Sequence, residues 1–236
     1  MKINDFEVQI AKKDIKNIHL GVYPPEGRIR VAAPLNINDE TIRLFIISKI
    51  HWINKQCTKF IEQQRQTKRE YVSGETHYFL GRKYRLNVIY TNSHQKVEIT
   101  KKTHIDLHIK PNTSIEKREA LLNRFYRMEL KKQSPSLINK WSKIIGVKVN
   151  QINIKKMKTK WGTSNPNYNR IWLNLELAKY SIHCIEYVIV HEMTHFLEKN
   201  HTEKFYRLMD SFLPNWQQYK NELNNSVLGY FEWNNS

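Results

Sequence analysis

The stretch VIVHEMTHFLEKNH, Val188 to His201, contains three histidines and two glutamates beside an apolar run. The run Val188–Val190 is β-branched and has low helix propensity, so by itself it fits either a strand or a helix. The polar residues favour a helix, because side chains four residues apart lie on the same helical face. Apolar residues recur at helical spacing from Ile182 to Ile189. We therefore predict one helix within Ser181–Leu197, buried on one side.

His191, Glu192 and His195 form the pattern H-E-x-x-H. On a helix, the two imidazoles point to one side and can bind the same metal ion. Glu192 lies about 100° around the helix from His191, which places its carboxylate near a water on the metal rather than on the metal itself. A catalytic zinc ion takes three protein ligands and keeps one open position. The pattern therefore predicts one zinc ion per chain, with Glu192 as the catalytic residue.

The third ligand must come from outside this pattern, and His201 is the nearest candidate. A continuous helix would turn His201 away from the other two histidines, so the chain must break between Phe196 and His201. Asn200 can end the first helix or cap the next one. Glu198 and Glu203 are rival ligands, since two histidines and one glutamate also form a catalytic zinc set. Spacing and the affinity of zinc for imidazole favour His201.

The first half of the chain, residues 1–112, is β-rich. Its short segments alternate between apolar and polar residues and are separated by turn residues, as strands do. One long helix is predicted over residues 36–66, because apolar residues recur there at helical spacing. The boundary to the second half is predicted at Pro111–Ser114. The first half is therefore expected to be an N-terminal α+β region.

The second half, residues 113–236, begins with a predicted helix that Pro135 interrupts. Two strands, over residues 151–161 and 170–177, follow on either side of a turn. A last helix is predicted over residues 202–213, ending before a proline. Together with the helix of the histidines, these elements predict an α+β fold.

The net charge of +17 is high for 236 residues, and it is unevenly distributed. Between Leu130 and Leu175 there is no Asp or Glu. A field of one sign raises the local concentration of polyanions, so this basic region, residues 131–170, predicts a surface for DNA or another acidic partner. A solvated basic face is the alternative. The cationic residues of the region are Lys131, Lys132, Lys140, Lys143, Lys148, Lys155, Lys156, Lys158, Lys160 and Arg170.

No apolar run approaches the roughly 18 residues of a membrane span, and the first residues lack the apolar core of a signal peptide. Cys57 and Cys184 are too few for a disulfide framework. We expect a cytoplasmic protein without a membrane partner.

The stretches MKTKWGTSNPNYNRIWLNLEL (residues 157–177) and IEYVIVHEMTHFLEKNHTEKFYRLMDSFLPNW (residues 185–216) resemble the YgjP-like family of metal-dependent hydrolases. This family is similar to the SprT-like and WLM zincin proteases. YVSGETHYFLGRKYRLNV, residues 71–88, resembles the Gly-Glu and Leu-Gly segment of the family, so the likeness runs over most of the chain. The chain departs from the family at Thr163–Ser164, where the family usually has Ser-Cys.

This resemblance implies a zincin-like catalytic domain, in which the active-site helix packs on a small mixed sheet, and the two halves could form one YgjP-like unit. It also implies zinc on His191, His195 and His201. Glu192 would be the general base of a metallopeptidase that acts on peptide bonds. The basic region favours proteins associated with nucleic acid as its substrates. The alternatives are a nucleic-acid-binding module with a structural zinc, and a hydrolase of a non-peptide amide.

In zincins an edge strand beside the active helix pairs with an extended peptide, and residues 170–177 are expected to be that strand. Asn174 is a candidate for a contact with substrate or with a zinc ligand. Tyr206, or Tyr187, could stabilise an oxyanion. Trp161 and Trp172 are expected to be core residues rather than a platform for substrate.

Overall fold

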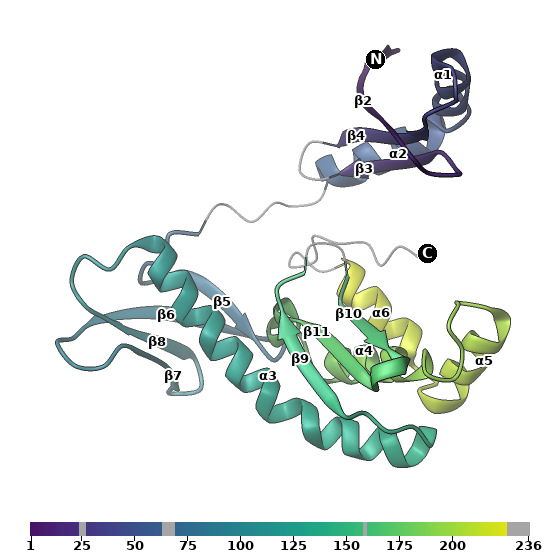
Figure 1. The fold of residues 1–236 in the computed structure, drawn as a ribbon. Helices are drawn as coiled ribbons and strands as arrows, with labels where there is room; N and C mark the ends of the chain where they lie inside the picture. The colour runs from purple at the N-terminus through teal and green to yellow at the C-terminus, as the bar shows by residue number, and fades with distance from the viewer. Residues whose placement is uncertain (24–26, 63–68, 158–159, 226–236) are drawn as a thin grey trace. The chain divides into compact units, whose positions relative to one another are not determined.

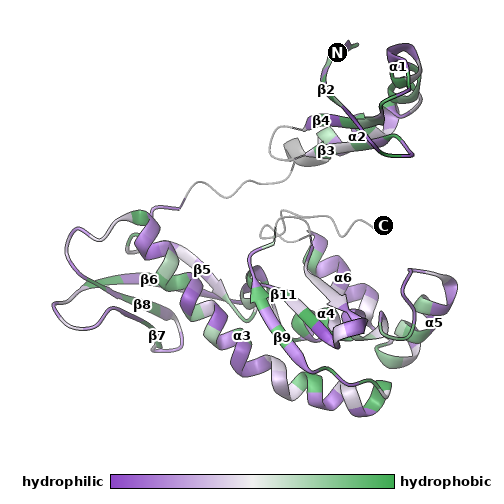
Figure 2. Cartoon of the chain, in the orientation of Figure 1, coloured by the Kyte–Doolittle hydropathy of each residue, from purple (hydrophilic) through white to green (hydrophobic). Residues whose placement is uncertain are grey.

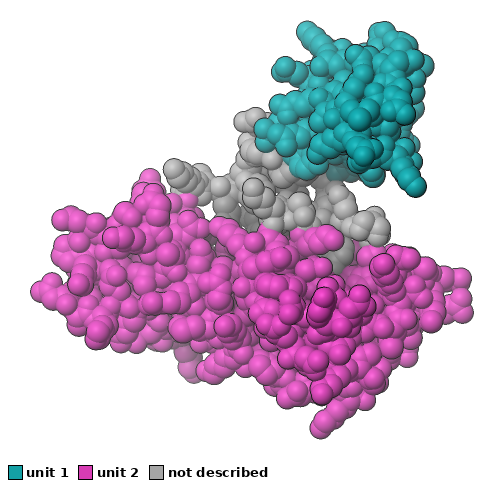
Figure 3. All heavy atoms as spheres, in the orientation of Figure 1, with its two compact units in different colours: residues 1–66 teal, residues 67–236 magenta. Residues whose placement is uncertain are grey.

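The computed structural model describes the chain except for residues 24–26, 63–68, 158–159 and 226–236 (Figure 1). It has the predicted α+β class, with small mixed sheets and helices. The chain divides into two compact units, Met1–Gln66 and Thr67–Ser236 (Figure 3). In the described part of the chain, no helix has both the length and the apolar character that crossing a membrane requires.

The first unit contains a four-stranded sheet and two helices. The strand order is β1 (Lys2–Ile3), β2 (Phe6–Lys13), β4 (Arg28–Pro34) and β3 (His19–Tyr23). The helices are α1 (Asp39–Ser48) and α2 (Ile50–Glu62). Val31 of the sheet and Ile42, Ile46 and Ile53 of the helices share one buried core.

The prediction of one long helix over residues 36–66 was wrong. The chain breaks at Lys49, whose φ of −104° and ψ of 6° depart from helical values. The N–H of Lys49 bonds back to Ile46 and closes α1. The break changes the direction of the chain, and Ile42, Ile46 and Ile53 on either side of it reach the same core.

The second unit begins with another four-stranded sheet, which packs against α3 (Ile115–Ile145). Its strand order is β5 (Thr76–Phe79), β6 (Arg82–Tyr90), β8 (His104–Ile109) and β7 (Lys96–Thr100). Phe79 of the sheet contacts Phe125 of α3, with ring centroids 5.4 Å apart. The predicted boundary at 112/113 therefore lies inside this unit, because β5–β8 and α3 share one core.

The helix α3 runs without interruption through Pro135, so the predicted break was wrong. Proline removes one backbone hydrogen bond of a helix. Here Pro135 is exposed, while Leu130, Ile138 and Trp141 on either side of it are buried in the core. This tertiary burial offsets the cost of the proline and keeps α3 continuous. Ser114 caps the helix at its start, and Gly146 ends it in the left-handed conformation.

A three-stranded mixed sheet follows, in the order β10 (Gly162–Asn165), β11 (Arg170–Asn174) and β9 (Gln151–Lys155). β10 pairs with β11 antiparallel, and β9 pairs with β11 parallel. The strand expected at the edge, residues 170–177, therefore holds the central position, and β10 is an edge strand. The central strand, β11, also ends at Asn174 and not at residue 177, because residues Leu175–Lys179 form a 3-10 helix, η2.

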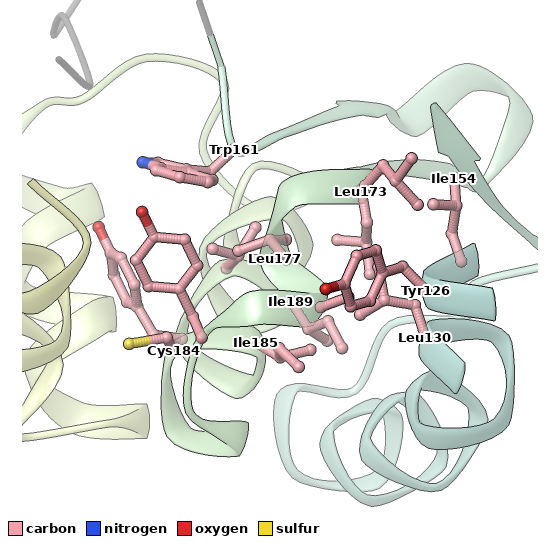
Figure 4. Packing of buried hydrophobic residues seen from close by; sticks show 14 of the residues in the cluster. Tyr126, Leu130, Ile154, Trp161, Leu173, Leu177, Cys184, Ile185 and Ile189 are labelled. Atoms are coloured by element: carbon pink, nitrogen blue, oxygen red, sulfur yellow. The ribbon is translucent and has the colours of Figure 1, made fainter. Parts of the chain in front are cut away.

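Three helices complete the second unit: α4 (Ile182–Thr194), α5 (Glu203–Phe212) and α6 (Trp216–Asn225). α4 packs against β10 and β11 on one side and against α3 on another. Ile189 of α4, Leu173 of β11 and Leu130 of α3 lie in one cluster (Figure 4). Most residues of α4 are apolar, as its hydropathy shows (Figure 2).

Candidate metal centre

The apolar run of the opening stretch is helical, as predicted. Val188, Ile189 and Val190 lie inside α4 and have no exposed surface. α4 begins at the cap Ser181 and ends at Thr194, whose hydroxyl donates a hydrogen bond to the carbonyl of Val190. The low helix propensity of the run is outweighed by its burial between the sheet and α3.

The chain reverses directly after α4. Phe196, Leu197 and Glu198 each donate a backbone hydrogen bond to the last turn of the helix. Thr202 then caps α5 by accepting a hydrogen bond from the N–H of Phe205. This turn lies where the break was predicted, and it returns His201 to the face of α4 that carries the other histidines.

His191, His195 and His201 form a compact group. Each offers one ring nitrogen, and these nitrogens all lie within 4.8 Å of one another. Nε2 of His191 is 3.1 Å from Nε2 of His201. Two nitrogens on one tetrahedral zinc ion lie about 3.3 Å apart, given Zn–N bonds of about 2.0–2.1 Å. The donor set and its spacing therefore fit a metal ion with one open position.

The turn also orients His195. Its Nδ1 lies 3.1 Å from the carbonyl oxygen of Glu198, an acceptor that holds the proton on Nδ1. Nε2 of His195 is then free of its proton and can bind a metal. A backbone carbonyl as partner of a ligand imidazole is a common arrangement in metal sites.

The rival carboxylates lie outside this group. The side chain of Glu203 is 86% exposed and pairs with Arg207. Glu198 accepts a hydrogen bond from the N–H of Asn200, and its other oxygen lies 3.9 Å from Lys204. Among the residues that the structure describes, the group of possible metal ligands consists of the three histidines alone.

The surroundings favour the neutral form of His191 and of His195. Burial lowers the pKa of His191 well below its usual range, and the neighbouring His195 and His201 lower it further. Burial also lowers the pKa of His195. Metal binding requires the neutral imidazole, so this environment favours binding at neutral pH.

Phe205 of α5 packs against all three imidazoles. Its ring centroid is 5.0 Å from that of His191 and 4.7 Å from those of His195 and His201. Phe205 is 1% exposed and therefore shields one side of the three imidazoles from water. The sequence alone does not reveal this contact, because the position of Phe205 next to the histidines depends on how α5 packs against α4.

Glu192 is almost completely buried beside this group, with 3% of its surface exposed. Burial raises the pKa of Glu192 to about 8, although a hydrogen bond with the side chain of Ser164 and the charge of Lys160 act in the opposite direction. A carboxylate with a pKa near neutrality is suited to accept and release a proton. Ser164 stands at the departure from the family motif, and its contact with Glu192 was not predicted.

The strand β10 lies directly on Glu192. A Cβ atom added to Gly162 would lie 2.7 Å from Oε1 and 2.8 Å from Cγ of Glu192, and 2.9 Å from Cγ1 of Val188. Gly162 and Ser164 point to the same face of β10, because side chains alternate along a strand. Glycine at position 162 thus allows the strand to approach, and Ser164 bonds the carboxylate.

The other candidate residues have different surroundings. Asn174 is fully buried; its amide nitrogen donates to the carbonyls of Met157 and Lys160, and its oxygen accepts from the N–H groups of Met157 and Glu176. These four bonds give it a role in holding the chain that leads into β10. Tyr206 stacks on His201, with centroids 6.3 Å apart, and on Trp216.

Three histidines next to a buried carboxylate could hold a metal ion beside an acid/base group. The chain belongs to the YgjP-like family, because the profile of the YgjP-like metallopeptidase domain matches residues 16–226. Among solved structures, the metallopeptidase zymogen of Pyrococcus abyssi abylysin is similar over 38% of this chain and 90% of that chain. The identity is 17% and the TM-score is 0.36. A comparison with curated protein sequences found no match.

Proposed function

We propose that this chain is a zinc-dependent metallopeptidase in which Glu192 is the general base. The observation that carries the proposal is the convergence of His191, His195 and His201 beside the buried carboxylate of Glu192. Family membership supports the hydrolysis of peptide bonds as the reaction class.

Zinc is the metal that this donor set favours, with one ion per chain. Three imidazoles suit a borderline-soft cation, and three protein ligands leave an open position for catalysis. Structural zinc sites usually have four protein ligands and are rich in cysteine. The two cysteines lie elsewhere, Cys57 in the first unit and Cys184 at the start of α4. A structural clip is therefore the weaker alternative.

When bound, zinc would lower the pKa of a water molecule and polarise the carbonyl of the peptide bond. Glu192 accepts a proton from the attacking water at a carboxylate oxygen and later transfers it to the nitrogen of the leaving amine. Ser164 holds the carboxylate in place during both transfers, because its hydroxyl bonds to Glu192. Phe205 and the apolar residues of α4 exclude other water from beneath the site.

An extended peptide would pair with the open edge of β10. This strand is an edge strand that contacts α4, and edge strands of this kind bind peptides through main-chain hydrogen bonds. Substrates that are bound to nucleic acid fit the proposal, because the basic region adds ten cationic residues and no carboxylate to the same chain.

The test combines zinc analysis with cleavage of fluorescently labelled unfolded proteins. Glu192→Gln should keep one zinc per chain and lower kcat by about 10²- to 10⁴-fold. Glu203→Gln, which removes an exposed carboxylate of the same region, is the matched control and should keep both. Equal turnover of wild type and Glu192→Gln would refute the role of Glu192. Cleavage of small amides but not of proteins would favour the non-peptide hydrolase.

A further inference from the structure

The sheet β10-β11-β9 has a polar outer face that the peptidase site does not use. Ile171 and Leu173 of β11 point inward and are fully buried, so Trp172 between them points outward. Trp172 is partly exposed and lies between Thr163 of β10 and Asn153 of β9. The prediction that Trp172 is a core residue was therefore wrong, whereas Trp161 is buried as expected.

Two aromatic rings on this face each have a cation beside them. Nζ of Lys155 on β9 lies 4.6 Å from the ring of Trp172. Cζ of Arg170 on β11 lies 5.7 Å from the ring of Tyr168, which is 66% exposed. Tyr168 belongs to the 3-10 helix η1 (Pro166–Tyr168), which connects β10 and β11. The outer face therefore carries ring surfaces and positive charges close together.

The described carboxylates lie away from these two cations. Among the described residues, neither Lys155 nor Arg170 has an ion pair within 4.0 Å. In contrast, Lys140 pairs with Glu186 and Lys156 pairs with Glu119. The basic region thus contains cations that bind acidic residues of the same chain, and also Lys155 and Arg170, which lie beside aromatic rings without a described carboxylate within 4.0 Å.

We infer that this outer face, formed by Lys155, Tyr168, Arg170 and Trp172, binds single-stranded nucleic acid. Bases stack on aromatic side chains, and cations next to the rings bind the phosphates that connect the bases. The long side chain of Lys155 can reach a phosphate beside the ring of Trp172, since no carboxylate of the described residues lies within 4.0 Å of it. Duplex DNA keeps its bases stacked inside the helix and offers only its phosphates to such a face.

This binding site goes beyond the proposed peptidase and does not depend on it. The inner face of the same sheet contacts α4 and Glu192, while the outer face carries the two rings. Glu192→Gln should therefore bind nucleic acid as wild type does. A failed peptidase assay and a failed binding assay would refute different proposals.

The test measures binding of a fluorescent single-stranded oligonucleotide, such as oligo-dT of about 12 nucleotides, by anisotropy at several salt concentrations. Tyr168→Ala should weaken binding at least about 5-fold, because stacking of one base is lost. Tyr90→Ala is the matched control, since Tyr90 is 61% exposed on β6, which belongs to the four-stranded sheet of the second unit. It should bind as wild type does.

Charge reversal supplies the second comparison. Lys155→Glu should weaken binding at least 10-fold and reduce its salt dependence. Lys131→Glu makes the same change at an exposed position of α3 in the basic region, and it should have a smaller effect. Equal effects of both reversals, or of Tyr168→Ala and Tyr90→Ala, would refute the site. Tighter binding of duplex DNA or of a polyglutamate peptide than of the oligonucleotide would also overturn it.

Discussion

Replacing Gly162 with alanine tests whether β10 and Glu192 lie as close together as the structure shows. The new Cβ would meet Oε1 and Cγ of Glu192 and Cγ1 of Val188 at 2.7, 2.8 and 2.9 Å. Real Cβ atoms essentially never approach other heavy atoms closer than 3.0 Å, so strand or side chain must move. The backbone of Gly162 is not in the left-handed region, so the cost of replacing it with alanine is steric alone.

Overpacking of a buried site by one methyl group costs about 1–3 kcal/mol. We expect Gly162→Ala to lower the free energy of unfolding by this amount, because three close contacts in a buried place cannot all relax. Displacement of the carboxylate should also lower kcat by about 10-fold or more, since small errors in the position of a catalytic group are costly. KM should change little, because the substrate edge of β10 is still present.

Urea unfolding measures the stability, and cleavage of a labelled unfolded protein measures the activity. Gly146→Ala is the control: it replaces a glycine with φ of 76° that has nothing within 4 Å. It should cost about 1 kcal/mol through backbone strain and leave kcat unchanged. In a Glu192→Ala background the cost of Gly162→Ala should fall, because two of the three contact atoms are gone. An equal cost in both backgrounds would refute the close approach.

His201→Ala should lose most of the zinc seen by elemental analysis, whereas Glu203→Ala should keep it, because only His201 lies beside the other ligands; the reverse pattern would make Glu203 the ligand. Burial lowers the pKa of His77 to about 4, so the folded state disfavours its protonated form. Its contribution to stability is then complete above a pH of about 6.5 and is lost as the pH falls toward 4, by at most about 3 kcal/mol. His77→Gln should flatten this decline in urea titrations; a decline equal to that of wild type would assign it to other groups.

The helix of the candidate metal ligands could be predicted from the sequence because its signal is local. The spacing of His191 and His195 depends only on helical geometry, and the need for a turn before His201 depends only on the number of residues between them. Both features appear in the structure. Family membership could also be predicted, because the motifs that carry it are contiguous in the chain.

The wrong predictions of secondary structure and strand position have a common physical origin. Apolar spacing over residues 36–66 is the same for one helix or two, and only the core of the first unit requires the break at Lys49. Pro135 is a local signal for a break, but burial of the residues around it keeps α3 continuous. The residue pattern of strand 170–174 does not distinguish an edge strand from a central strand, because that depends on its pairing partners in other segments of the chain.

The sequence by itself determined which residues can bind the metal and which can serve as the base, because these are properties of side-chain type and helical spacing. Only the tertiary structure decided what surrounds them. Gly162 and Ser164 reach Glu192 by way of a strand, and Phe205 reaches the histidines by way of another helix. These contacts set the burial of the carboxylate and of the imidazoles, and thereby their pKa values. Burial depends on the packing of distant segments, which spacing along one chain does not encode.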